Sequence, residues 1–61
     1  MPAYRCFFTR GDSAPTVKII ESDRDGEAIA RARELLELRP ADLGMEIWKD
    51  ERLLVRVARA R

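Results

Sequence analysis

The strongest constraint on the fold is an alternation of side chains between Met45 and Ala58. Met45 to Trp48 forms one alternating run, Lys49 to Arg52 supplies a charged turn, and Leu53 to Val57 resumes with apolar residues. Two such runs around a short turn predict a β-hairpin. Because successive side chains of a strand point to opposite faces, one face would carry Met45, Ile47, Leu53, Val55 and Val57, and the other Glu46, Trp48, Leu54 and Arg56. The second face is too apolar for ordinary solvent-exposed surface.

A second hairpin is predicted in the first third of the chain. The segment from Ala3 to Thr9 reads as a strand with aromatic residues on both faces, and Arg10 to Pro15 has the composition of a turn. The β-branched residues of the segment from Thr16 to Glu21 predict the returning strand.

One amphipathic helix is predicted between the two hairpins. The segment from Ser22 to Glu27 offers capping side chains and places acidic groups where a helix N-terminus favours negative charge. Pro40 is expected to end the helix near Leu38 or Arg39. The apolar stripe of this helix consists of Ala28, Ile29, Ala32, Leu35 and Leu36.

These segments predict a single α+β domain over residues 1–61, in the order β-β-α-β-β, with a four-stranded, antiparallel-rich sheet and one helix on one face. The strand order stays open. The side chains expected under the helix are Cys6, Phe8, Val17, Ile19, Met45, Ile47, Leu53, Val55 and Val57. Those expected on the uncovered face are Arg5, Phe7, Lys18, Ile20, Glu46, Trp48, Leu54 and Arg56.

Size and composition limit the ways in which such a domain can be stabilised. A chain of 61 residues buries only about 60% of the surface that its unfolded form exposes, so oligomerisation would help it. With one cysteine, Cys6, and no histidine, neither a disulfide nor a zinc site is expected, and no cofactor motif is present. The net charge of +1 provides no long-range electrostatic attraction to DNA or anionic lipid. Without a signal peptide or a long apolar segment, the expected location is the cytoplasm.

The uncovered face is the main candidate for function. Phe7, Ile20, Trp48 and Leu54, framed by Arg5 and Arg56, exceed the scattered apolar residues of a monomer surface, which predicts a non-enzymatic homodimer or a protein–protein interaction. A loop or the end of the chain could instead cover this face. A one-residue error in strand phase is also possible, since adjacent apolar pairs occur at Phe7-Phe8, Ile19-Ile20 and Leu53-Leu54.

Two other functions are compatible with the sequence. Phe7 and Trp48 beside Arg5, Lys18 and Arg56 would suit a platform that stacks the bases of single-stranded nucleic acid and holds its phosphates. Near-neutral charge and the acidic Glu46 argue against that assignment.

The proline at position two resembles the small tautomerases, in which removal of the initiator methionine leaves an N-terminal proline amine as general base. That resemblance implies a basic role for Pro2 and carboxylate binding by Arg10 or Arg39. The strand from Thr16 to Glu21 departs from the tautomerase pattern, which runs from the first strand almost directly into the helix.

Nearly the whole chain also resembles a group of short hypothetical proteins that are abundant in alphaproteobacteria. The similarity lies in Met1 to Tyr4, Phe7-Phe8, the helix entry from Asp25 to Ile29, and Met45 to Trp48 followed by Arg52. These motifs are structural, and none is a catalytic signature. The resemblance implies a bacterial cytoplasmic setting and supplies no function.

Overall fold

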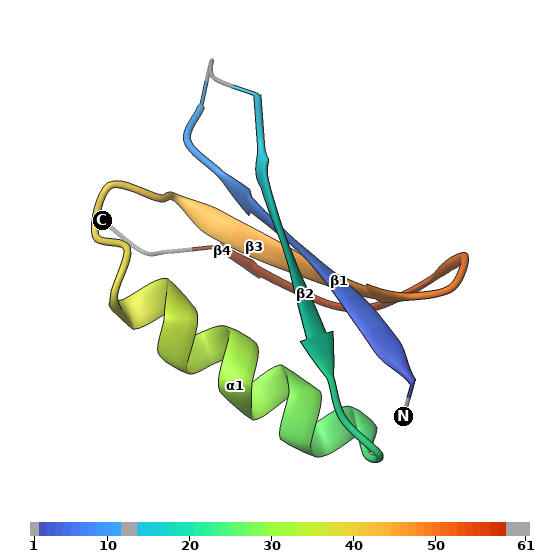
Figure 1. The fold of residues 1–61 in the computed structure, drawn as a ribbon. Helices are drawn as coiled ribbons and strands as arrows, with labels where there is room; N and C mark the ends of the chain where they lie inside the picture. Colours follow the sequence, from blue (N-terminus) through green and yellow to red (C-terminus); the bar gives the residue numbers. More distant parts are fainter. Residues whose placement is uncertain (1, 12–13, 59–61) are drawn as a thin grey trace.

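The computed structural model describes residues 2–11 and 14–58, and it confirms the predicted order of elements (Figure 1). Met1, on which the tautomerase interpretation also depends, lies outside the described residues. The elements are β1 (Ala3–Thr9), β2 (Thr16–Glu21), α1 (Asp25–Glu37), β3 (Gly44–Lys49) and β4 (Arg52–Ala58). Together they make an α+β fold of one sheet and one helix.

The four strands form one antiparallel sheet in the order β2-β1-β3-β4. Each hairpin therefore contributes one central strand, and the two hairpins meet where β1 pairs with β3. Their central ladder runs from Tyr4 opposite Lys49 to Thr9 opposite Gly44. Figure 1 shows α1 on one side of this sheet, with β2 nearest the viewer.

The start of α1 is organised by Ser22, a buried residue just before the helix. Its hydroxyl accepts a hydrogen bond from the Arg24 N–H at 3.2 Å and donates one to the Glu27 carboxylate at 2.8 Å. Asp25 and Glu27 add negative charge to the first turn, which the helix dipole favours. The helix ends at Glu37, with the Leu38 N–H bonded to the Leu35 carbonyl and Pro40 preventing continuation.

The core lies between α1 and the sheet. β1 contributes alternate side chains, because every second residue of a strand faces the same way. The helix contributes mainly small residues, which allow its backbone to approach the sheet closely. The core residues are Tyr4, Cys6, Phe8, Ile20, Ala28, Ala32, Leu36, Met45 and Ile47.

The predicted phase of β2 is wrong by one residue. Ile20 lies opposite Tyr4 and is only 6% exposed, so it belongs to the core and not to the uncovered face. Lys18 lies opposite Cys6, on the helix side of the strand. Val17 and Ile19 consequently face away from α1. Alternation within β2 cannot distinguish two adjacent isoleucines, whereas pairing with β1 fixes which one is buried.

The predicted alternation of β4 is also wrong at one point. Ile47 lies opposite Val55, but Trp48 lies opposite Leu53, so the register shifts between these two pairs. Leu54 is the extra residue and packs against the core, not on the uncovered face. Leu53, expected under the helix, shares a face with Trp48. An irregularity of this kind places two residues of one strand against one of its partner and resets the alternation.

Candidate functional site: the open face of the sheet

The side of the sheet that faces away from α1 is called the open face here. Two rows of paired residues cross it, because directly opposed residues of antiparallel strands share a face. One row joins Val17, Phe7, Glu46 and Arg56. The other joins Ile19, Arg5, Trp48 and Leu53.

The apolar side chains of the open face are only partly shielded. Phe7, Trp48 and Leu53 are half-buried, while Val17 and Ile19 on the outer strand are among the most exposed large hydrophobic residues described. No described helix or strand packs over this side of the sheet. The open face therefore presents partly exposed apolar side chains from all four strands, with Arg5 and Glu46 between them.

The polar groups on the open face have partners within the chain. The two carboxylate oxygens of Glu46 accept hydrogen bonds from Trp48 Nε1 at 3.1 Å and from Arg56 Nε at 2.8 Å. Arg5 donates to the carbonyl of Asp50 in the β3–β4 turn. Burying such groups costs less than burying unpaired ones, because they keep these hydrogen bonds when water leaves. The face is thus suited to contact with another apolar surface.

Four of the six residues predicted at an interface share the open face. Arg5, Phe7, Trp48 and Arg56 come together there, whereas Ile20 and Leu54 lie in or against the core. Sequence reasoning missed three open-face residues, which are Val17, Ile19 and Leu53. The doublets Ile19-Ile20 and Leu53-Leu54 were the available signal for these residues. In a regular strand one member of each doublet must lie on each face of the sheet, and otherwise the alternation is broken.

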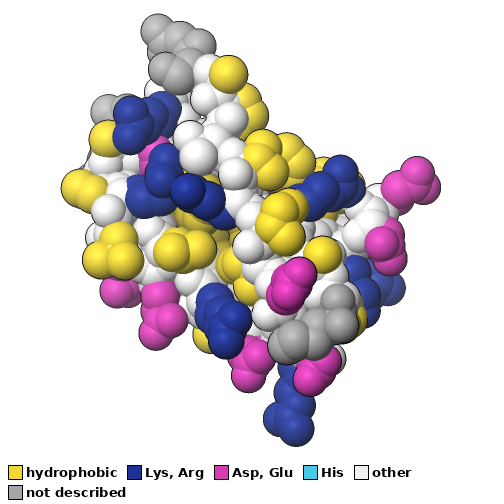
Figure 2. All heavy atoms as spheres, viewed as in Figure 1, with side chains coloured by type: hydrophobic (Ala, Val, Ile, Leu, Met, Phe, Trp, Pro, Cys, Tyr) yellow, Lys and Arg dark blue, Asp and Glu magenta, His cyan; other side chains and the backbone are white. Residues whose placement is uncertain are grey.

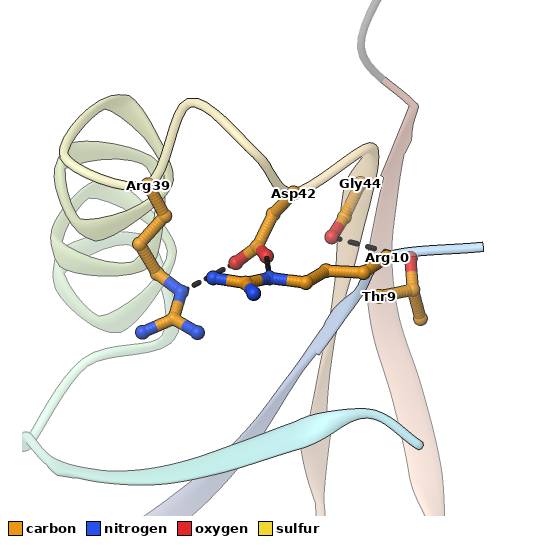
Figure 3. Close-up of polar contacts among 5 residues, drawn as sticks. All are labelled: Thr9, Arg10, Arg39, Asp42 and Gly44. Atoms are coloured by element: carbon orange, nitrogen blue, oxygen red, sulfur yellow. Dashed lines mark hydrogen bonds and ion pairs between the residues drawn. The ribbon is translucent and has the colours of Figure 1, made fainter. Parts of the chain in front are cut away.

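A second polar cluster lies at the opposite end of the helix from Ser22 (Figure 3). The buried carboxylate of Asp42 binds Arg39, which follows α1, and accepts a hydrogen bond from Arg10 Nε at 2.8 Å. Arg39 also lies over the Phe8 ring, 5.1 Å from its centroid. The hydrogen bond from Arg39, with that from Arg10, lowers the pKa of Asp42 against the opposing effect of burial. Asp42 therefore stays ionised at neutral pH and ties the α1–β3 loop to the end of β1.

This cluster brings together the two arginines that the tautomerase resemblance named, but Pro2 lies elsewhere. Pro2 precedes β1, where its carbonyl accepts a hydrogen bond from the Ser22 N–H at 3.1 Å. Arg10 follows the far end of β1. At about 3.3 Å per residue, a strand of this length separates the two positions by roughly 25 Å. The structure therefore places no arginine of this pair beside Pro2.

Two buried titratable groups have pKa values that keep them neutral. Tyr4 donates a hydrogen bond to Asp25 at 2.5 Å, and this bond, with burial, raises the pKa of Tyr4 to about 12. Burial raises the pKa of the Cys6 thiol to about 11, which suppresses the thiolate. Both groups stabilise the core and are poor nucleophiles at neutral pH.

Within residues 2–11 and 14–58, no group of three or more acidic, cysteine or histidine side chains is arranged to hold a metal ion. The same part of the chain contains no helix long and apolar enough to cross a membrane. The chain matches no family model, no curated protein and no solved structure. The geometry of the open face is thus the basis for a functional assignment.

Proposed function

We propose that this domain is a non-enzymatic interaction module whose open face packs against the open face of a second copy. The observation that carries the proposal is the apolar surface of Phe7, Trp48 and Leu53, extended by Val17 and Ile19, on a sheet side that no described element covers. Monomeric proteins seldom expose several large apolar side chains together on one face. The proposed setting is the bacterial cytoplasm, supported by the sequence resemblance and by a free, buried Cys6.

A second copy suits this face because positive groups of one copy can pair with negative groups of the other across a twofold axis. The open face carries Arg5 and Arg56 against Glu46, with Glu21 at its rim. An isologous contact brings this mixture against an identical one, so opposite charges are available on both sides. Nucleic acid would require uncompensated positive charge, whereas Arg56 is already paired with Glu46.

The size of the face predicts a dimer that dissociates on dilution. Four strands about 4.8 Å apart and six residues of about 3.3 Å each give a projected area of roughly 400 Å². Standard interfaces bury about 800 Å² of accessible surface per partner. We therefore expect association in the micromolar range or weaker.

Trp48 provides a direct test, because it is the only tryptophan in the chain. If the open faces meet, its fluorescence emission moves to shorter wavelength as concentration rises, in parallel with a monomer–dimer transition in sedimentation velocity. Trp48→Glu buries a charge in the interface and should weaken association at least tenfold, because removal of one large apolar contact is worth about 1.5 to 3 kcal/mol. Leu53→Glu should act in the same direction and serves if Trp48→Glu does not fold.

The matched control is Ala30→Glu, which adds the same charge on the exposed side of α1 and should leave association unchanged. A wild-type chain whose Trp48 emission does not change at millimolar concentration would refute the face-to-face dimer. A labelled single strand of mixed sequence should not bind. Binding that weakens steeply with salt and is lost in Trp48→Glu would instead assign the face to nucleic acid.

A further inference from the structure

The outer edge of β2 and the groove beside it form a second unpartnered surface. β2 ends the strand order and pairs with β1 alone, so the backbone groups on its other side have no strand partner. An open groove with a volume of about 840 Å³ lies between β2 and α1, with Ile19, Ile20, Leu35 and Leu38 as its apolar lining. Figure 2, viewed toward this edge, shows hydrophobic side chains gathered over β2 and the end of α1.

Exposed apolar surface is concentrated at this edge. Among the described residues, four large hydrophobic side chains are exposed, and three of them belong to β2 or line its groove. They are Val17, Ile19 and Leu38, with exposed fractions of 48%, 58% and 78%. Val17 and Ile19 lie on the side of β2 that faces away from α1, and Leu38 lines the groove on the helix side, so exposed apolar side chains flank this edge on both sides.

The two edges of the sheet differ in their capacity to pair. β4 contains the register shift opposite Trp48, and an irregularity of this kind discourages pairing with another strand. β2 carries two charged residues, Lys18 and Glu21, but it keeps continuous register with β1 from Thr16 to Glu21. β2 is therefore the edge that can accept a further strand.

The charges around the groove favour an identical partner. The groove is lined by Arg31, Glu21 and Glu34, and Lys18 of β2 adds a second positive charge on the helix side of the strand, so both signs are present. In an isologous contact the patch meets itself, and a patch of one sign would repel its copy. A patch that carries both signs offers opposite charges on both sides of the axis.

We propose that β2 pairs antiparallel with β2 of a second copy, about a twofold axis perpendicular to the sheet that passes between the two Ile19 residues. Centring on Ile19 places two isoleucines opposite one another. Centring on Lys18 would set two like charges directly opposite, which is destabilising. This contact joins two sheets edge to edge, puts both helices on one side, and leaves both open faces free. It does not depend on the face-to-face dimer.

Disulfide trapping with single cysteines tests this register. Directly opposed residues of antiparallel strands have Cα atoms about 4.5 to 5.5 Å apart, within disulfide range. Ile19→Cys should therefore cross-link two chains under a mild oxidant. Val17→Cys is the matched control, because four residues of offset separate Val17 from its copy by roughly 13 Å. Native Cys6 is fully buried and does not interfere.

Both cysteine variants are made in the Trp48→Glu background, or in Leu53→Glu if the first does not fold, so that the open face is disabled. We expect Ile19→Cys to give at least tenfold more linked dimer than Val17→Cys. Adding Leu38→Glu should reduce the Ile19→Cys yield about tenfold. Equal yields from the two cysteine variants, or no linked dimer from Ile19→Cys, would overturn the proposal.

These experiments test the two proposed interfaces independently. Absence of cross-linking through Ile19 leaves the concentration-dependent emission of Trp48 unaffected, because Trp48 lies two strands away from β2. Absence of that emission shift leaves cross-linking through Ile19 unaffected in turn.

Discussion

Two adjacent isoleucines of β2 are expected to contribute very differently to stability. Ile20 lies in the core opposite Tyr4, whereas Ile19 is more than half exposed on the open face. Truncation of a buried isoleucine to alanine costs about 2 to 5 kcal/mol, because it removes apolar contacts and leaves a cavity. We expect a loss near 3 kcal/mol for Ile20→Ala, and a loss below about 1 kcal/mol for Ile19→Ala, whose side chain is largely in water already.

The expected loss for Ile20→Ala is large for a domain of this size. At about 0.05 to 0.15 kcal/mol per residue, the free energy of unfolding of 61 residues is roughly 3 to 9 kcal/mol. Ile20→Ala should therefore remove a third of the stability or more. Urea unfolding, followed by circular dichroism at a concentration below any association, gives both values with an unchanged slope. Equal losses for the two variants, or a larger loss for Ile19→Ala, would refute the assigned phase of β2.

Two further predictions concern packing and pH. A Cβ atom at Gly44 would lie 2.5 Å from the Val57 carbonyl oxygen, so Gly44→Ala should destabilise the domain by about 1 to 3 kcal/mol in urea unfolding. Gly26→Ala, which meets open space in α1, should stabilise it by about 0.5 to 1 kcal/mol, and an equal effect at both glycines would contradict the close approach at Gly44. Tyr4 is the only tyrosine, and its ultraviolet absorbance should titrate near its pKa of about 12 and not near 10. Its contribution to stability is complete below pH 10, the pKa of the unfolded state, and is lost as pH rises through 12. Ionisation of folded Tyr4 near pH 10 would show that its hydrogen bond to Asp25 is absent in solution.

The sequence was sufficient to predict the elements, because each boundary has a local chemical cause. The bounds Ala3–Thr9 and Thr16–Glu21 agree with the predicted ones, since turn-forming residues from Arg10 to Pro15 separate two runs of strand-forming residues. Helix α1 begins and ends near the predicted positions, because Ser22 bonds to the start of the helix, acidic residues occupy its first turn, and Pro40 follows it.

The faces of the two edge strands could not be predicted in the same way. Whether Ile19 or Ile20 is buried depends on the register between β2 and β1. This register is set by pairs such as Tyr4 and Ile20, which are distant in sequence, and not by a local preference. The register shift near Trp48 likewise depends on how β3 and β4 meet. It leaves Leu53 on the open face and Leu54 against the core.

The Asp42 cluster was only partly readable from the sequence. Arg39 lies three residues before Asp42, so a local ion pair could have been expected. Arg10 lies 32 residues away, and its contact depends on the pairing of β1 with β3, which the sequence left open. The buried carboxylate therefore follows from the strand order.

The strand order also determines at which stage of folding water can be excluded from the hydrophobic core. Phe8 and Cys6 of β1 lie beside Met45 and Ile47 of β3, so β1 obtains its second neighbour from a strand that follows β2 and α1 in the chain. The two strands of each hairpin are close in sequence, whereas joining the hairpins closes a longer loop that contains α1 and carries a larger entropic cost. We therefore expect solvent to leave the core when the two hairpins join along the middle of the sheet.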